Sequence, residues 1–167
     1  MEIKKGKAFK FGDGISTDHI APGRLFHLRS NLEEFSKHVL EDADPNFASS
    51  MKKGDFVVAG SNFGLGSSRE HAPQIIKIAG VGVVIAKSFA RIFYRNAINI
   101  GLLLIECDTD KIDAGDELEL DVQKGVLKDV TKNIEIEIMP LPDVMIKLLN
   151  DGGLIEHIKK NGDFSFV

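Results

Sequence analysis

Three continuous apolar runs, each four to seven residues long, divide the first two thirds of the chain into strands and helices. Residues 55–59, 80–86 and 102–106 are mostly apolar, and 80–86 is rich in β-branched side chains, as strands buried on both faces are. The segments between them, 70–78 and 88–101, have apolar residues at helical spacing. This strand–helix–strand–helix–strand order predicts a parallel βαβαβ unit.

The pattern changes to strict alternation after residue 115, which predicts antiparallel hairpin strands with one face toward water. The alternating segments are residues 116–122, 126–130 and 134–138, followed by two short helical patterns at 143–150 and 154–160. A first strand is expected at 7–11, and Ser30 with Glu33 forms a capping-box pattern that predicts a helix over 31–40. With no internal repeat or linker, residues 1–167 are expected to form one mixed α/β domain with a partly barrel-like sheet.

A glycine-rich turn at residues 60–72, Gly-Ser-Asn-Phe-Gly-Leu-Gly-Ser-Ser-Arg-Glu-His-Ala, connects an expected strand to an expected helix. Glycines at 60, 64 and 66 permit positive φ and close approach of a ligand. Ser67 and Ser68 are placed to cap the next helix, whose free N–H groups attract anions, and Arg69 adds a forked donor. The turn therefore predicts an anion site with a hydroxyl group, and the alternative is an ordinary capped turn.

The spacing of these glycines argues against a nucleotide. It lacks the lysine of a phosphate-binding P-loop and does not match the dinucleotide fingerprint.

Two further segments have polar residues in suggestive positions. Thr17, Asp18 and His19 offer a hydroxyl, a carboxylate and an imidazole in succession, and the alternative is that residues 16–18 simply cap a helical turn, as Ser-Thr-Asp clusters commonly do. Ser88 is expected to cap the helix that Gly101 ends.

Composition narrows the class of protein. A net charge of −4 argues against nucleic acid or an anionic membrane surface as the main partner. The absence of an apolar leader or membrane-length run favours the cytoplasm. Cys107 is the only cysteine, which excludes an intrachain disulfide and a four-thiolate metal site, and the five histidines are scattered. We therefore expect no metal site within this chain.

Three segments together resemble the swivelling domain of the aconitase superfamily: residues 16–20, 60–72 and 88–102. A free-standing chain of this length is similar to the small subunits of 3-isopropylmalate dehydratase and homoaconitase, and the resemblance covers nearly the whole chain. It implies a three-layer β/β/α fold. It also implies a large-subunit partner, in a heterodimer or heterotetramer, that holds a [4Fe-4S] cluster on three cysteines.

The reaction implied by the resemblance is dehydration and rehydration of a small hydroxy di- or tricarboxylate, with iron as Lewis acid on the hydroxyl. By position in the motifs, Ser67 would be the base and Arg69 would stabilise its negative oxygen and hold a substrate carboxylate. Ser68 would hydrogen-bond the same region. Thr17 and Asp18 match the family's Thr-Asp pair near the active site, with Asp18 orienting a basic partner, while His19 is either part of the site or structural.

Substrate choice depends on the segment 26–30. Arg29 resembles the arginine with which aconitases and homoaconitases bind an extra carboxylate, whereas isopropylmalate enzymes often have an apolar residue there. An unpaired arginine facing an alkyl group is desolvated without compensation. We expect interconversion of 2- and 3-isopropylmalate, in leucine biosynthesis, because that enzyme is the commonest owner of a separate small subunit. The alternatives are a homoaconitase or 2,3-dimethylmalate dehydratase small subunit and, more distantly, a non-catalytic binding module, against which stands the intact Ser67–Arg69 pair.

Overall fold

A seven-stranded mixed sheet forms the centre of the computed structural model, which describes residues 1–162. The strand order is β4-β3-β2-β1-β5-β6-β7. β1 to β4 run parallel to one another, and β5 to β7 form an antiparallel meander that pairs with β1. The strands are β1 Lys4–Lys10, β2 Phe56–Val58, β3 Val83–Ala86, β4 Leu104–Glu106, β5 Glu117–Asp121, β6 Val126–Asp129 and β7 Ile134–Glu137.

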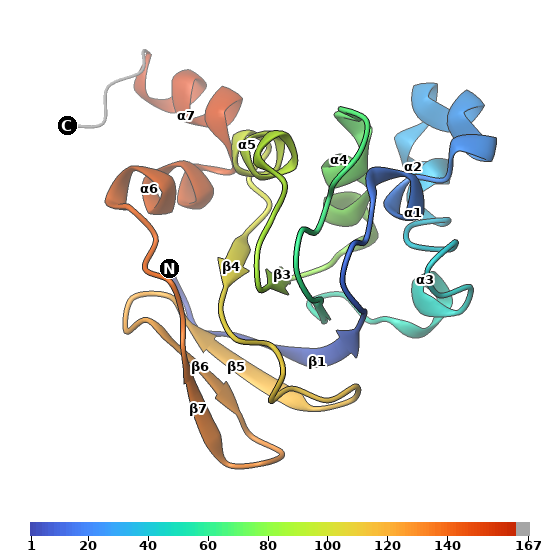
Figure 1. The fold of residues 1–167 in the computed structure, drawn as a ribbon. Coiled ribbons are helices and arrows are strands. Elements are labelled where there is room, and N and C mark those ends of the chain that lie inside the picture. The colour runs from blue at the N-terminus through green and yellow to red at the C-terminus, as the bar shows by residue number, and fades with distance from the viewer. Residues whose placement is uncertain (163–167) are drawn as a thin grey trace.

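β1 belongs to both halves of the sheet and lets it curl. Its end, Ala8–Lys10, pairs in parallel with β2, while Lys4–Lys7 pairs antiparallel with β5. The two outer edges then approach each other, because Cys107 after β4 forms an isolated bridge with Ile138 after β7. Figure 1 shows the hairpin strands folded below the parallel strands. The expected mixed α/β fold with a partly barrel-like sheet is confirmed.

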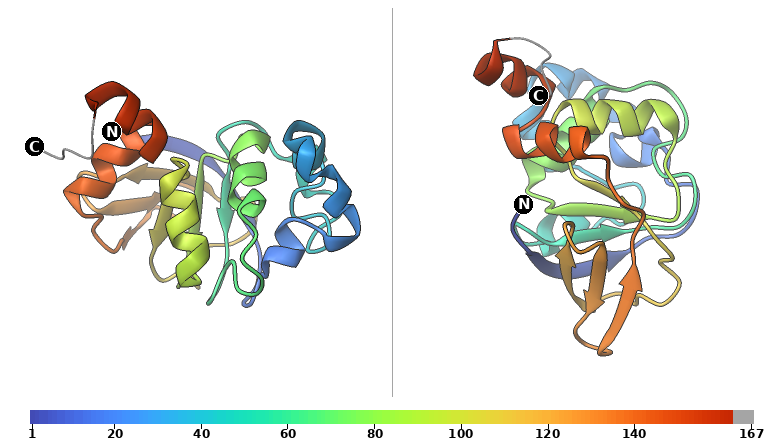
Figure 2. Two further views of the ribbon diagram at one scale, coloured as in Figure 1. Left: turned by 90° about the horizontal axis from the view of Figure 1, so that it is seen from above. Right: turned by 90° about the vertical axis from the view of Figure 1, so that its left-hand side faces the viewer.

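The helices lie on the side of the parallel strands that faces away from the hairpin (Figures 1 and 2). α4 and α5 cover the middle of this face, the short N-terminal helices lie at one end, and α6 with α7 lies at the other. Every helix among the described residues is too short or too polar to cross a lipid bilayer. The helices are α1 Thr17–Ile20, η1 Gly23–Ser30 (a 3₁₀ helix), α2 Leu32–Ser36, α3 Phe47–Ser50, α4 His71–Ala79, α5 Arg91–Asn99, α6 Asp143–Asp151 and α7 Leu154–Asn161.

Two cores lie on opposite faces of the parallel strands, which explains why these strands are apolar throughout. In β2, Val57 packs into the core beneath the helices, whereas Phe56 and Val58 pack into the core against the hairpin strands. In β3, Val84 and Ile85 alternate between the cores in the same way. Helices, parallel strands and hairpin strands thus form three layers, as the apolar runs and the alternating segments require.

One helix differs from its sequence prediction. Asn31, not Ser30, caps α2, since its side chain accepts a hydrogen bond from the backbone N–H of Glu34 at 3.2 Å. α2 ends at Ser36, and the chain continues through tight turns to Leu40, whose φ is +57°. The predicted helix over 31–40 was therefore too long, because the N–H groups of residues 37–39 donate to carbonyls three residues back instead of four, and the positive φ at Leu40 cannot continue a right-handed helix.

Candidate functional site

The glycine-rich turn lies at the carboxyl end of β2, between the segments that follow β1 and β3. The Gly64 N–H donates to the carbonyl of Ile15 at 2.7 Å, and the Thr17 N–H donates to the carbonyl of Leu65 at 2.8 Å. On the other side, Phe63 forms a parallel bridge with Phe89. The three segments with the family resemblance therefore follow three adjacent parallel strands and meet at one edge of the sheet.

The three glycines of the turn serve two different purposes. Gly64 and Gly66 have φ values of +83° and +100°, as expected. Gly60 does not have a positive φ, so that expectation was wrong for it. Gly60 is needed for space instead, because a Cβ there would lie 1.8 Å from the Asp13 carboxylate, which accepts the Ser61 N–H at 2.7 Å.

A cleft of about 420 Å³ lies between this turn and the start of α5. Thr17, Ser67, Ser68 and Arg69 line it from one side. Residues 89–93 with Asn96 line it from the other side. Four of the six predicted site residues thus share one cleft.

The predicted serine caps are not formed. α4 begins at His71 with Glu70 as its N-cap residue and no side-chain cap. The Glu70 backbone already has helical angles, whereas a capping side chain needs an extended residue at that position. Ser67 and Ser68 precede the cap position and are exposed.

The helix start that lines the cleft belongs to α5, not to α4 as the sequence suggested. Ala90 is the N-cap residue of α5 and provides no side-chain cap. Ser88, predicted to cap this helix, instead accepts a hydrogen bond from the Asn62 N–H at 2.8 Å. Ser88 thereby ties the α5 segment to the glycine-rich turn.

Asp18 holds Arg69 at the edge of the cleft. Asp18 Oδ1 lies 2.9 Å from Arg69 Nη1, which also donates to the carbonyl of Ala21 at 2.8 Å. Asp18 itself is fixed by the Gly23 N–H at 2.9 Å, and any side chain at Gly23 would collide with it. The guanidinium therefore has a defined orientation, although Asp18 does not line the cleft.

Thr17 supports the backbone of Ser67. Its side chain is 3% exposed, and Oγ1 donates a hydrogen bond to the Ser67 carbonyl at 2.8 Å. The neighbouring Ser16 caps α1 and forms a reciprocal capping box with His19. Of the two alternatives for His19, the structure shows the structural contact.

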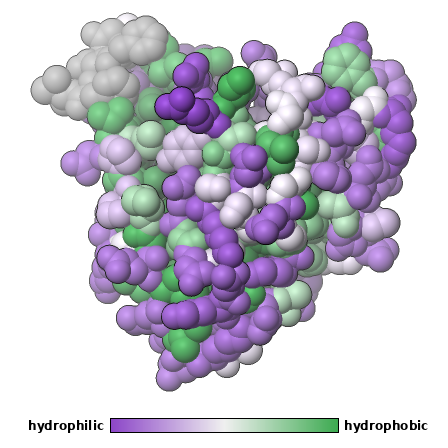
Figure 3. Space-filling model, viewed as in Figure 1, coloured by the Kyte–Doolittle hydropathy of each residue, from purple (hydrophilic) through white to green (hydrophobic). Residues whose placement is uncertain are grey.

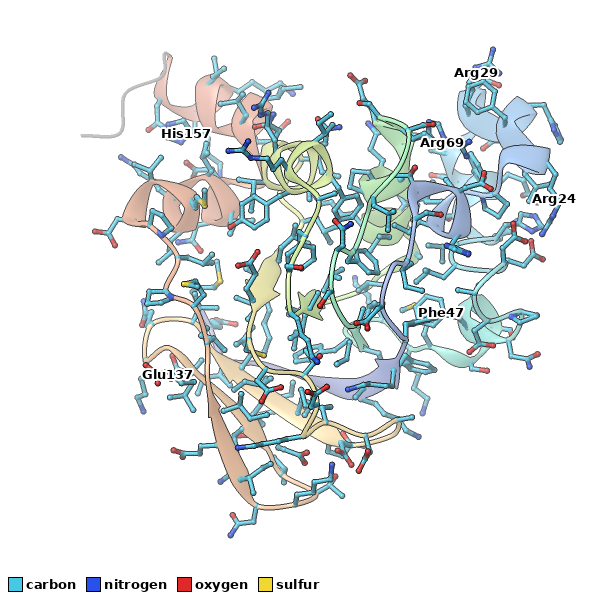
Figure 4. All side chains as sticks on the ribbon, in the orientation of Figure 1. Arg24, Arg29, Phe47, Arg69, Glu137 and His157 are labelled. Carbon is cyan, nitrogen blue, oxygen red and sulfur yellow. The ribbon has the colours of Figure 1, made fainter. Side chains whose placement is uncertain are left out.

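Arg29 lies apart from the cleft. It belongs to η1, where its Nη1 donates to the Phe26 carbonyl at 3.2 Å and its guanidinium lies 4.3 Å from the centre of the Phe26 ring. It is absent from the cleft lining, and Figure 4 shows it at the outer end of the N-terminal helices, farther out than Arg69. The structure does not bring Arg29 together with the other predicted residues.

His71 is a neighbour of the site that sequence reasoning missed. Its ring stacks on Phe35 and meets the edge of Phe26, and Nε2 is buried with no hydrogen-bond partner among the described residues. Burial, together with the positive charges of Arg69 and Arg29, lowers the pKa of His71. The imidazole is therefore held neutral at physiological pH.

The described residues do not fit a metal cluster. Residues 1–162 contain no group of three or more His, Cys, Asp or Glu side chains arranged to hold a metal ion. Burial raises the pKa of the Cys107 thiol to about 12, so that it stays protonated, whereas iron binds the thiolate.

A larger groove of about 560 Å³ adjoins the cleft and contains none of the predicted site residues. It runs between α5, α6 and the segment before α6, and shares Phe89 and Arg91 with the cleft. Figure 3, in the orientation of Figure 1, shows apolar side chains among polar ones on the left of the molecule, where α6 lies. With Leu141, Val144 and Met145 in its lining, the groove is mostly apolar and lacks the hydroxyl-rich character of the cleft.

Comparison with known proteins identifies the family of this site. The aconitase C-terminal domain family matches residues 34–110. The chain is 64% identical to 3-isopropylmalate dehydratase small subunit 2 of Archaeoglobus fulgidus, over 95% of this chain and 96% of the relative. It belongs to the 3-isopropylmalate dehydratase small-subunit family. Small subunit 1 of Thermotoga maritima is 60% identical over 98% of this chain and 99% of that protein.

A solved structure supports the same assignment for the fold. 3-Isopropylmalate dehydratase (LeuD) of Methanocaldococcus jannaschii superposes with a TM-score of 0.92 at 45% identity, covering 96% of each chain. The resemblance inferred from the three sequence segments is confirmed. Membership of a small-subunit family also implies a large-subunit partner.

Proposed function

We propose that this chain, as one swivelling domain over residues 1–167, is the small subunit of a hydro-lyase that interconverts 2- and 3-isopropylmalate by dehydration and rehydration, a step of leucine biosynthesis. The observation that supports this most strongly is 52–64% identity, over more than nine tenths of the chain, to proteins named 3-isopropylmalate dehydratase small subunit. The cleft contains groups suited to this reaction, namely the exposed hydroxyl of Ser67 and the guanidinium of Arg69.

The partner in this proposal is a large subunit, in a heterodimer or heterotetramer, that closes over the cleft. A [4Fe-4S] cluster on that subunit would supply a Lewis acid at the substrate hydroxyl. The small subunit supplies the proton-transferring and substrate-holding groups.

Ser67 Oγ is the proposed base, taking a proton from the carbon next to the one that bears the hydroxyl. A serine hydroxyl is a weak acid, so its negative form needs nearby positive charge and a dry site. Arg69 lines the same cleft and provides positive charge, and Thr17 fixes the Ser67 backbone. Ser68 is exposed beside them and is placed to donate to the substrate.

The hypothesis of a homoaconitate or other tricarboxylate substrate depends on Arg29, which would bind the additional carboxylate. In the structure its guanidinium packs on Phe26 outside the cleft lining. An alkyl-bearing dicarboxylate is therefore the better match, because no unpaired arginine then faces the alkyl group.

The test is reconstitution with the large subunit from the same genome under anaerobic conditions. We expect turnover of isopropylmalate, followed by the ultraviolet absorbance of the unsaturated intermediate, with much weaker turnover of homoaconitate. Ser67→Ala should reduce kcat at least about a hundredfold, the usual range for loss of a general base, while leaving subunit assembly intact.

Two results would contradict the proposal. Preference for homoaconitate would reassign the substrate, and unchanged turnover by Ser67→Ala would mean that the base lies elsewhere. Sedimentation of the assembly gives the stoichiometry in the same experiment.

A further inference from the structure

The proposed substrate carries two carboxylates, whereas Arg69 is a single cation of the cleft. Nη1 of Arg69 already contacts Asp18 at 2.9 Å and the Ala21 carbonyl at 2.8 Å. These two contacts occupy part of the hydrogen-bonding capacity of its guanidinium. Arg29, the other arginine predicted for this purpose, does not line the cleft.

Arg91 is the other charged residue that lines the cleft, and among the described residues its guanidinium is not paired as that of Arg69 is. It lines the cleft with Ser67 and Ser68, its residue is exposed, and it forms no ion pair with any of residues 1–162. An exposed guanidinium in a cleft that already contains hydroxyl donors is suited to a ligand carboxylate, which it can bind through two parallel N–H···O bonds.

The backbone of Arg91 is fixed relative to Ser67. Arg91 is the first residue of α5, and Phe89, two residues before it, forms an isolated parallel bridge with Phe63 of the glycine-rich turn. The Ala90 N–H donates to the Phe63 carbonyl at 2.9 Å, and the Phe63 N–H donates to the Ser88 carbonyl at 3.0 Å. The segments that carry Arg91 and the proposed base are therefore hydrogen-bonded to each other, which favours a substrate-positioning role.

We propose that Arg91 binds a carboxylate of the substrate on the side of the cleft opposite Ser67. This inference rests on the proposed function and extends it by a residue for which the sequence motifs suggested no role. The two arginines then have different roles. Arg69, oriented by Asp18, lies beside the reacting carbon, and Arg91 determines which end of the substrate faces Ser67.

Arg95 offers a matched control. It lies one helical turn farther along α5, is also exposed, and lines the apolar groove but not the cleft. Because Arg91 borders both hollows, the rival explanation is a contact with the large subunit. Apparent affinity for the large subunit and KM at saturating large subunit separate these two roles.

The experiment compares Arg91→Ala, Arg91→Lys and Arg95→Ala in the reconstituted enzyme with isopropylmalate. We expect Arg91→Ala to raise KM about tenfold to a hundredfold, as loss of a charge-assisted bond does, with a smaller change in kcat. Arg91→Lys should recover part of the loss, since it keeps the charge without the fork. Arg95→Ala should stay within about twofold of wild type, and thermal melting of the isolated chains should be unchanged because both residues are exposed.

Three outcomes would overturn the inference. They are a KM at saturating large subunit within twofold of wild type for Arg91→Ala, equal effects of Arg91→Ala and Arg95→Ala, or a loss confined to affinity for the large subunit. An inactive wild-type assembly would instead refute the proposed function, and this inference would fall with it.

Discussion

Replacing Thr17 with valine tests whether the hydrogen bond from the Thr17 side chain holds the backbone of Ser67 in place. Valine keeps the branched shape of threonine in a site that is 3% exposed. It removes the donor of the 2.8 Å hydrogen bond from Thr17 Oγ1 to the Ser67 carbonyl. The change thus deletes one contact to the proposed base without creating a cavity.

The cost in stability should be modest. An intramolecular hydrogen bond contributes about 0.5–1.5 kcal/mol net, and more when its remaining partner is left buried without water. Ser67 is exposed, so that water can reach this turn, and we expect a loss of about 1 kcal/mol in the free energy of unfolding. For a chain of this size, that loss corresponds to a fall of about 2–4 °C in Tm.

The cost in turnover should be much larger. A displacement of a reacting group by about 1 Å can lower the rate about a hundredfold. We therefore expect kcat of the reconstituted enzyme to fall about tenfold to a hundredfold in Thr17→Val. Thr17→Ser, which keeps the hydroxyl, is the matched control and should retain most of the activity.

The assays are urea denaturation of the isolated chain and steady-state turnover with saturating large subunit. If Thr17→Val lost stability as expected but kept kcat within twofold of wild type, Ser67 would not depend on this bond. If Thr17→Ser were as impaired as Thr17→Val, the methyl group and not the hydroxyl would be the important part. Either result would refute the positioning role.

Four further substitutions test the glycine-rich turn, a buried carboxylate and a partly buried imidazole. Gly66→Ala should lose about 1–2 kcal/mol to its φ of +100° alone, whereas Gly64→Ala should lose more, since its Cβ would also lie 2.2 Å from Phe93; urea denaturation measures both. Burial raises the pKa of Asp129 above its unfolded value near 3.8. The stability that Asp129 contributes is therefore present below the unfolded pKa and is lost as the pH rises through the folded pKa. Asp129→Asn should raise the free energy of unfolding at pH 7 and make that free energy depend less on pH. The lowered pKa of His71 has the opposite sign, so stability should fall as the pH drops through about 6.5, and His71→Phe should remove that fall in melts between pH 7 and 5.

The strands were predictable from the sequence because their signal is local. Continuous apolar runs marked β2 to β4 and strict alternation marked β5 to β7, each set by which faces of the strand are buried. The N-terminal caps of α2, α4 and α5 were not predictable, because a cap depends on the backbone angles of one residue, whereas Ser16 does cap α1. Glu70 takes helical angles in a turn held by long-range contacts, so Ser67 and Ser68 do not cap α4.

A long-range contact explains the requirement at Gly60, and a local contact explains the position of Arg29. Gly60 looked like a glycine of positive φ, yet its requirement is set by the Asp13 carboxylate, 47 residues earlier in the chain. Arg29 looked like a substrate ligand from its place after the Thr-Asp pair. Its partner in the structure is Phe26, three residues earlier in the same 3₁₀ helix, so that Arg29 packs against its own helix and does not line the cleft.

The involvement of α5, by contrast, follows from topology and could have been reached from the sequence. A βαβαβ unit makes β2 and β3 parallel neighbours, and β1 pairs in parallel on the other side of β2. Loops after the carboxyl ends of adjacent parallel strands lie side by side, which is where open α/β sheets bind ligands. Residues 16–20, 60–72 and 88–102 follow β1, β2 and β3 in turn, so their meeting is a consequence of strand order. Arg91 enters the cleft for that reason, and the same reasoning makes it a stronger candidate than Arg29 for the second carboxylate of the substrate.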